Sequence, residues 1–173
     1  MNKCIFLDRD GVINEDRGTY TFRIRDFKVM AGVKKGLSIL KDAGYILVVV
    51  TNQAGISRGL FSESDMQKCH DLMMEETGHL IDDIYYATYY PEFSDSLMRK
   101  PESLMFEKAI AKYNIDPSHS WMIGNSSRDL EPAIKLGIRT VFIGDHKPEY
   151  EFDLSANDLL EAAGKIMAYQ NMS

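Results

Sequence analysis

Two carboxylates stand one residue apart where an apolar run ends: Asp8 and Asp10 follow Lys3–Leu7, and Gly11 comes next. Alternate residues of an extended chain point to the same side, so these two side chains can converge beyond the tip of a strand. Carboxylates held that close repel each other unless a cation lies between them or one stays protonated. Mg²⁺ favours carboxylate oxygens together with water and substrate phosphate, and a carboxylate can form an acyl-phosphate while its neighbour moves a proton. The pair therefore indicates an enzymatic site, and the alternative is a loop whose acids cap a turn.

A second polar pair, Thr51 and Asn52, follows the apolar run Val48–Val50. A hydroxyl and an amide at a strand end can donate hydrogen bonds to phosphate oxygens without adding charge. Both residue types are also ordinary choices for a helix cap or a turn, which is the better interpretation of this pair taken alone.

Two further segments carry groups suited to phosphate chemistry. Lys100 lies between Arg99 and Pro101, and the proline favours an extended conformation at the lysine. Such a lysine can neutralise a phosphoryl group between the acids, and the alternative is a solvated loop lysine. Asn125 comes just after another apolar run and can offer its carbonyl oxygen to a cation. Asp129 is expected to support the loop or the start of a helix rather than to bind metal.

The elements that must position these residues alternate regularly between strands and helices. Strands are predicted at Lys3–Leu7, Tyr45–Val50, Asp83–Thr88, Ser120–Ile123 and Arg139–Ile143. Helices are predicted at Val33 up to Gly44, Glu63–Thr77, Leu104–Tyr113, Leu130–Leu136 and about Asn157 to Tyr169. Near-continuous apolar strands separated by helices predict an α/β fold, a Rossmann-like three-layer sandwich with a mainly parallel sheet covered on both faces. Such sheets bind ligands beyond the carboxyl ends of their strands, where the polar groups described above would meet.

Composition excludes several classes of function. The 173 residues carry a formal net charge of −6 and 45% are hydrophobic, which fits a single domain over residues 1–173 with its own core. An acidic chain lacks the basic face of a general nucleic-acid binder, and no apolar run approaches the roughly 20 residues of a membrane span. No secretory signal is visible, and Cys4 and Cys69 are expected to be reduced thiols, so we expect a cytoplasmic protein. A monomer is the default for such a domain.

Taken together, these residues resemble the four ordered motifs of the haloacid dehalogenase (HAD) superfamily. The motifs correspond to Asp8–Val12, Thr51, Lys100 and Gly124–Asp129. The resemblance implies that Asp8 is the phosphoryl-accepting nucleophile and that Asp10 is the general acid and base. Thr51 and Lys100 would hold the phosphoryl group, and Arg9 would turn its side chain away from both acids.

The closer likeness is to the branch of the superfamily that holds the heptose bisphosphate phosphatases and the histidinol phosphatases. The matching segments are Asp8–Asn14, Thr51–Phe61 and Arg99–Pro101. The likeness implies a substrate pocket and substrate contacts formed by Asp16, Arg17, Gly18, Thr19, Asn52, Gln53 and Arg99. Arg58 would reach a distal phosphate, since a guanidinium matches phosphate in a bidentate way, and the alternative is an exposed loop arginine.

The metal site implied by the resemblance departs from the family pattern. Mg²⁺ would be bound by Asp8, the backbone carbonyl of Asp10 and Asn125. The family usually has Asp at position 125, so the missing charge should weaken Mg²⁺ binding, although an amide oxygen can still coordinate. Ser126 stands where the branch often has Lys, and it would contact phosphate with less attraction.

The zinc loop of Cys and His that the branch usually carries is also missing. The corresponding stretches, Ala87–Pro91 and Ser96–Met98, hold no soft ligand, and a structural zinc site needs about four N or S donors. The histidines are too scattered in sequence to replace that loop: His70, His79, His119 and His146. We therefore expect no zinc.

The intervals between the motifs leave no room for a cap domain. The intervals from Asp8 to Thr51 and from Thr51 to Lys100 each span about 40 to 50 residues, which a strand–helix–strand unit of roughly 30 residues nearly fills. The resemblance implies a capless phosphatase acting on a small phosphorylated sugar, foremost a D-glycero-D-manno-heptose 1,7-bisphosphate cleaved at C7. The alternatives are histidinol phosphate or another small phosphate ester, and a weakly active phosphosugar-binding protein, which Asn125 favours.

Overall fold

A parallel β-sheet forms the centre of the structure, a computed structural model that describes residues 1–145 and 148–172. Its strands lie in the order β3-β2-β1-β4-β5-β6, and every neighbouring pair is parallel. The strands are β1 (Cys4–Leu7), β2 (Ile46–Asn52), β3 (Asp83–Ala87), β4 (Trp121–Gly124), β5 (Arg139–Ile143) and β6 (Leu154–Ala156). The first five confirm the predicted strands to within one or two residues. Strand β6 was not predicted, because three residues are too short to establish an alternating pattern.

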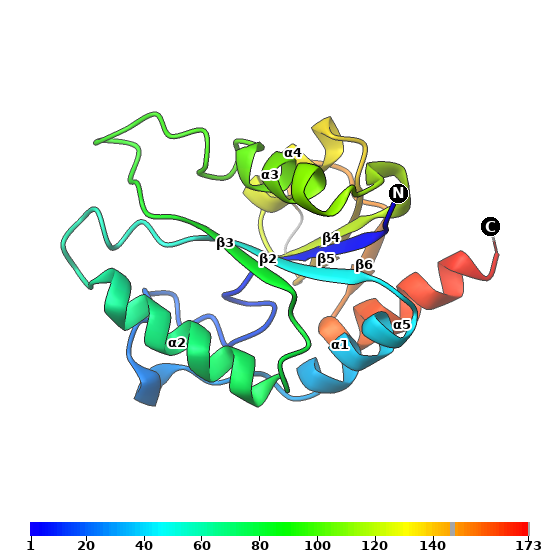
Figure 1. Ribbon diagram of the computed structural model, residues 1–173, viewed down its shortest axis with the longest axis horizontal. Helices are drawn as coiled ribbons and strands as arrows, with labels where there is room; N and C mark the ends of the chain where they lie inside the picture. The colour runs from blue at the N-terminus through cyan, green and yellow to red at the C-terminus, as the bar shows by residue number, and fades with distance from the viewer. Residues whose placement is uncertain (146–147, 173) are drawn as a thin grey trace.

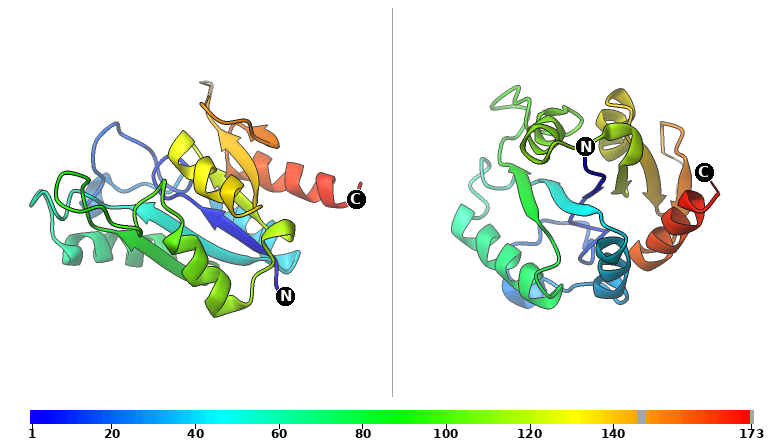
Figure 2. Two further views of the ribbon diagram at one scale, coloured as in Figure 1. Left: turned by 90° about the horizontal axis from the view of Figure 1, so that it is seen from above. Right: turned by 45° about the vertical axis from the view of Figure 1, so that its right-hand side comes forward.

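Helices cover both faces of this sheet. They are α1 (Val33–Asp42), α2 (Glu63–Glu76), α3 (Leu104–Tyr113), α4 (Ser127–Lys135) and α5 (Leu159–Gln170). Figure 1 shows α3 and α4 on one face and α1, α2 and α5 on the other, and the right-hand view of Figure 2 repeats this layering. The predicted three-layer α/β sandwich is therefore confirmed.

The core divides into two layers because the strands are apolar on both faces. Alternate residues of β1 take opposite sides: Ile5 and Leu7 pack under α1 and α5, whereas Phe6 packs under α3, its ring centroid 4.9 Å from that of Phe106. Each fully buried side chain of this kind stabilises the fold by roughly 1.5–3 kcal/mol. Cys4 and Cys69 are free, as predicted, and both are buried.

The order in which successive strands are added to the sheet reverses its direction at β1. Strands β2 and β3 lie on one side of β1, and β4, β5 and β6 lie on the other. In open α/β sheets a crevice forms at such a switch point, beyond the carboxyl ends of the strands. In the pairing register Leu7 lies beside Val49 and Ile123, so Asp8 emerges one step past this row, between β2 and β4.

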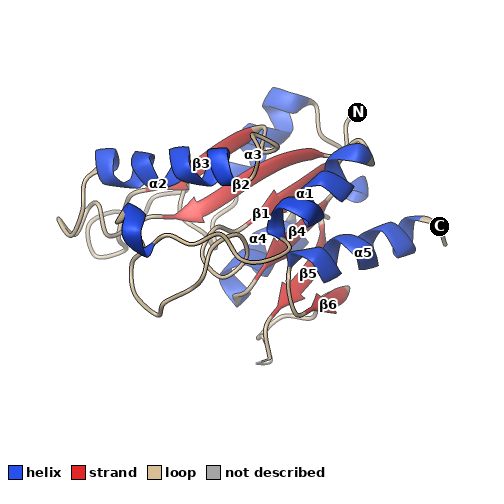
Figure 3. Cartoon of the chain, turned by 90° about the horizontal axis from the view of Figure 1, so that it is seen from below, coloured by secondary structure: helices blue, strands red, loops and turns tan. Residues whose placement is uncertain are grey.

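Long loops gather at this end of the sheet. Figure 3 shows them beyond the arrowhead of β2, on the opposite side of the molecule from both termini. In the part of the chain that the structure describes, no second domain lies over these loops, so the fold is capless. Within the same residues, none of the helices combines the length and apolar character that crossing a membrane requires. His146 lies outside the described residues.

Candidate active site

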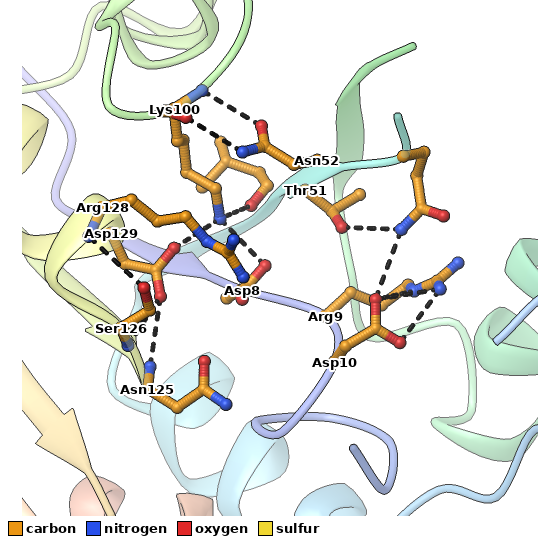
Figure 4. Close-up of polar contacts among 12 residues, drawn as sticks. Asp8, Arg9, Asp10, Thr51, Asn52, Lys100, Asn125, Ser126, Arg128 and Asp129 are labelled. Atoms are coloured by element: carbon orange, nitrogen blue, oxygen red, sulfur yellow. Dashed lines mark hydrogen bonds and ion pairs between the residues drawn. The ribbon is translucent and has the colours of Figure 1, made fainter. Parts of the chain in front are cut away.

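A buried cluster of two carboxylates and one ammonium group forms the floor of the candidate site. Lys100 Nζ donates to Asp8 Oδ1 at 2.9 Å and to the carbonyl oxygen of Val50 at 2.7 Å. It also forms an ion pair with Asp129 Oδ1 at 2.7 Å. The three charged side chains are at most 8% exposed. Figure 4 shows Lys100 Nζ between the two carboxylates, which come from the ends of β1 and the start of α4.

Burial and charge both perturb the titration of this cluster. Burial of the Asp8 carboxyl and the nearby Asp129 charge raise the pKa of Asp8 to about 6, although Lys100 opposes the shift. Burial by itself lowers the pKa of Lys100, but Asp129 and then Asp8 more than offset it and the pKa is raised. Lys100 is therefore charged, and the cluster carries one excess negative charge once Asp8 ionises. A cation bound beside Asp8 would remove that excess.

The backbone of Lys100 is held in place by Asn52 at the end of β2. Asn52 Nδ2 donates to the carbonyl oxygen of Lys100 at 3.0 Å, and Asn52 Oδ1 accepts from the Lys100 amide at 3.0 Å. This pair of hydrogen bonds crosses 48 residues of sequence, and it fixes where the lysine side chain begins. Asn52 was predicted to contact substrate, and its amide group here serves first to position Lys100.

Asp10 faces away from the buried cluster and is surrounded by donors. Arg9 Nε and Nη2 donate to its two carboxylate oxygens at 3.1 and 3.0 Å, Asn14 Nδ2 donates at 2.9 Å and Gln53 Nε2 at 3.3 Å. The expectation that Arg9 turns away from both acids is wrong. An arginine that is 1% exposed needs a charged partner, and the adjacent carboxylate supplies it.

Arg9 also ties Asp10 to its surroundings. Arg9 Nη2 donates to the carbonyl oxygen of Thr21 at 2.9 Å, and Nη1 lies 3.5 Å from His70 Nε2. Burial, and then the Arg9 charge, lower the pKa of His70 to about 4, so this imidazole is neutral near pH 7 and can accept a hydrogen bond. Arg9 thus holds Asp10 in place and connects it with His70 of α2 and with the backbone of Thr21.

Asn125 lies against the loop that follows Asp8. Gly11 has φ +84°, and a Cβ built on it would lie 2.0 Å from Asn125 Nδ2, so the amide occupies the space that only glycine leaves free. The amide oxygen points in the direction of Asp8 in Figure 4. Carboxylate, amide and backbone carbonyl oxygens are the hard donors that Mg²⁺ accepts, so the residues present fit this ion.

Asp129 supports the loop that carries Asn125 and Ser126. Asp129 Oδ2 accepts hydrogen bonds from the amides of Asn125 and Ser126 at 3.2 and 3.0 Å. A Cβ on Gly124 would lie 2.4 Å from Asp129 Cβ, so glycine at the strand end permits this close approach. These contacts agree with the supporting role expected for Asp129.

A cleft of about 430 Å³ opens beside the cluster, where Asp10, Arg99 and Arg128 adjoin it. It is lined by six of the predicted site residues: Asp10, Asp16, Gly18, Thr19, Asn52 and Arg99. Three further lining residues were missed by the sequence analysis, namely Tyr20, Ala54 and Arg128. Arg128 lies within the fourth motif, and its position beside Asp129 was the available signal.

Other predicted residues lie at the margin of the cleft. Arg17 forms an ion pair with Asp26 at 3.1 Å, and Arg58 Nη1 donates to Tyr20 Oη at 3.4 Å. Ser126 is the N-cap of α4, where its Oγ accepts from the Arg128 amide. The substrate contacts assigned to these three residues stay predictions.

Thr51 and Gln53 are buried beneath the cleft. Gln53 Nε2 donates to Thr51 Oγ1 at 2.9 Å, so the amide connects the threonine with Asp10. This arrangement leaves the Thr51 hydroxyl hydrogen available for an acceptor such as a phosphate oxygen. The described residues contain no group of three or more His, Cys, Asp or Glu suited to a metal ion, and the absence of zinc stays a prediction.

Comparison with known proteins places the chain in a family. A family model described as HAD-hydrolase-like matches residues 97–162. The D-glycero-beta-D-manno-heptose-1,7-bisphosphate 7-phosphatase of Haemophilus ducreyi is 44% identical over 147 residues, which cover 80% of each chain. The corresponding alpha-heptose enzyme of Photorhabdus laumondii is 37% identical over 150 residues, covering 82% of this chain and 81% of its own.

A solved structure agrees with this placement. The D,D-heptose 1,7-bisphosphate phosphatase from B. bronchiseptica, in complex with magnesium and phosphate, has a TM-score of 0.86 and 25% sequence identity, and the match covers 96% of this chain and 99% of that one. The chain belongs to the heptose-1,7-bisphosphate 7-phosphatase family of HAD-like hydrolases. It is an enzyme of the phosphatase class.

Proposed function

We propose that this phosphatase hydrolyses the C7 phosphate of a D-glycero-D-manno-heptose 1,7-bisphosphate, yielding the heptose 1-phosphate and inorganic phosphate. The observation that carries the proposal is the buried Asp8–Lys100 pair, whose neighbours Asp10, Asn52 and Arg99 line a cleft. A nucleophile in that position faces a phosphoryl group, and the cleft has room for a sugar above it. The names of the relatives from Haemophilus ducreyi and Photorhabdus laumondii supply the identity of the sugar.

The first chemical step is transfer of the phosphoryl group to Asp8. A carboxylate oxygen of Asp8 attacks phosphorus as the bond from phosphorus to the C7 oxygen breaks, and Asp10 gives its proton to that leaving oxygen. Lys100 and the Thr51 hydroxyl offset the charge on the transferred group. Arg9, Asn14 and Gln53 hold Asp10 while it moves the proton.

The second step regenerates the enzyme. Asp10, now ionised, takes a proton from water, and the resulting hydroxide attacks phosphorus and breaks the bond to Asp8. Inorganic phosphate leaves, and Asp10 is again protonated for the next substrate. One residue thus serves as acid and then as base.

Magnesium would be held by Asp8, the backbone carbonyl of Asp10 and Asn125. Bound there, it neutralises charge on the phosphoryl group and on Asp8. We further propose that zinc has no role, and that the enzyme works as a cytoplasmic monomer on a small phosphorylated sugar, without nucleic acid or membrane.

The function is tested by phosphate release from both anomers of the heptose bisphosphate, with ³¹P NMR identifying which phosphate is lost. We expect Mg²⁺-dependent loss of the 7-phosphate and retention of the 1-phosphate. Histidinol phosphate and a set of other small phosphate esters serve as competing substrates. Faster turnover of histidinol phosphate would replace the proposed substrate, and no turnover of any ester at high Mg²⁺ would leave only a phosphosugar-binding role.

Replacing Asn125 with Asp is expected to tighten Mg²⁺ binding roughly tenfold, equivalent to about 1.4 kcal/mol, because a second carboxylate then faces the cation. Turnover of this variant at limiting Mg²⁺ should rise as the affinity for Mg²⁺ rises. Calorimetric titration of Mg²⁺ and phosphate release at several Mg²⁺ concentrations measure the two effects. If Asn125→Asp alters neither of them, Asn125 is not a metal ligand.

A further inference from the structure

Two guanidinium groups from distant parts of the sequence line the same cleft. Arg99 directly precedes Lys100, and Arg128 projects from the first turn of α4. Figure 4 shows the Arg128 side chain extending from the start of α4 in the direction of Asp8 and Lys100. Burial, and then the nearby Arg128 charge, lower the pKa of Arg99, so the two cations lie close enough to interact.

Neither arginine is neutralised within the described residues. The polar contact of Arg99 is a donation from Nη1 to the carbonyl oxygen of Tyr89 at 3.4 Å, and its guanidinium lies 5.9 Å from the ring of Tyr90. No carboxylate in the described residues forms an ion pair with Arg99 or Arg128, although the chain carries 26 acidic residues against 20 basic ones. Two like charges held together in this way are unfavourable by themselves and are relieved by an anion.

The other candidate groups for that anion either serve another role or lie outside the lining of the cleft. The Ser126 hydroxyl caps α4. The guanidinium of Arg58 donates to Tyr20 Oη and lies 4.8 Å from the Tyr90 ring centroid, and it is not among the groups that line the cleft. Lys100 is already paired with Asp8 and Asp129. Among the described residues that line the cleft, Arg99 and Arg128 are therefore the two positive charges without an ion pair.

We propose that Arg128 is a specificity-determining residue, which together with Arg99 binds the phosphate that is not hydrolysed and so favours bisphosphates over monophosphates. The inference rests on the proposed function, because a heptose bisphosphate carries a second phosphate for this pair to bind. Guanidinium groups match phosphate oxygens in a bidentate way. Asp8 and Lys100 bind the phosphate that is hydrolysed, and the arginine pair recognises the second phosphate.

The test compares kcat/KM for the heptose 1,7-bisphosphate with kcat/KM for the heptose 7-phosphate in the wild type and in Arg128→Gln. We expect this preference ratio to fall about tenfold in the variant, mainly through KM, since a charge-assisted contact to one phosphate is lost. Arg128→Lys should recover part of the preference, because it keeps the charge without the bidentate geometry. Thermal unfolding of both variants checks that the fold is intact.

Arg25→Gln is the matched control, because Arg25 is exposed and lies outside the cleft. This variant loses the same charge and should keep the wild-type ratio. An equal loss on both substrates in Arg128→Gln, or an unchanged ratio, would overturn the assignment of Arg128.

A second substrate pair separates this inference from the proposed function. The same ratio is measured with fructose 1,6-bisphosphate and fructose 6-phosphate. Suppose that the wild type does not hydrolyse the heptose bisphosphate, but Arg128→Gln lowers the preference for the fructose bisphosphate. The proposed substrate is then wrong and the second-phosphate site stands. If the wild type hydrolyses the heptose bisphosphate but shows no preference for either bisphosphate, the function stands and the inference about Arg128 fails.

Discussion

Replacing Asp8 with Asn is expected to abolish phosphate release while making the Mg²⁺-free protein more stable. The loss of activity should be on the order of 10⁴-fold or more, because an amide cannot accept the phosphoryl group. No other carboxylate can take over, since Asp10 is held by Arg9 and Asp129 by Lys100 and the start of α4.

The gain in stability follows from the raised pKa of Asp8, which is about 6 in the folded protein against an ordinary value of 3.8 for aspartate. A folded-state pKa above the unfolded one means that the charged form is disfavoured, so stability falls as the pH rises from about 4 to 6 and stays lower above that. The difference of about 2 units corresponds to about 3 kcal/mol, which a neutral amide would recover at pH 7.5. At pH 4 Asp8 of the folded wild type is already protonated, and the gain in stability of Asp8→Asn should vanish.

Urea unfolding without Mg²⁺ at pH 4 and pH 7.5 measures this effect. Added Mg²⁺ should reverse the order of stability, because it binds the charged Asp8 of the wild type and not the amide. Asp71→Asn is the control, since Asp71 is an exposed residue of α2, and it should keep wild-type activity and show no gain. A variant Asp8→Asn that is less stable than the wild type at pH 7.5 would contradict the charge balance derived for the cluster.

Replacing Lys100 with Met is expected to have the opposite effect on stability and also to impair catalysis. The methionine fills a similar volume but leaves the carboxylates of Asp8 and Asp129 buried without their shared cation. Removing one partner of a buried ion pair costs about 3–5 kcal/mol. Activity should fall by about 10²- to 10³-fold or more, the range found when one group that stabilises developing charge is lost.

The pH dependence distinguishes this account from a simple packing defect. Without Lys100 the pKa of Asp8 should rise above its value of about 6, so the deficit in stability should grow as the pH rises beyond 6. At pH 5 Asp8 is mainly protonated in both folded proteins, and the deficit should be smaller. A packing defect would be independent of pH in this range. Lys112→Met, which removes an exposed ion pair with Asp83, is the control and should change little.

Much of the fold could be predicted from the sequence because its signals are local. The predicted strand Tyr45–Val50 and the predicted helix Glu63–Thr77 each depend on their own segment. Both are present in the structure, where a capping box of Ser62 and Asp65 begins the helix. The order of the polar groups after successive strands was equally local. It predicted that Asp8, Thr51 and Asn125 would meet at one edge of the sheet, since parallel strands end on the same side.

The tertiary structure decided which of these groups touch and which charges are balanced. Arg9 was expected to point away, and burial instead forces its guanidinium onto Asp10. Arg128 was missed although it lies in the fourth motif, because its role depends on Arg99. Arg99 lies 29 positions earlier in the sequence and becomes its neighbour only when α4 packs beside the Lys100 segment. The sequence by itself determined the kind of chemistry through residue types and strand ends. Long-range packing decided the pairing of charges, because desolvation and Coulomb interactions depend on distances that sequence spacing does not specify.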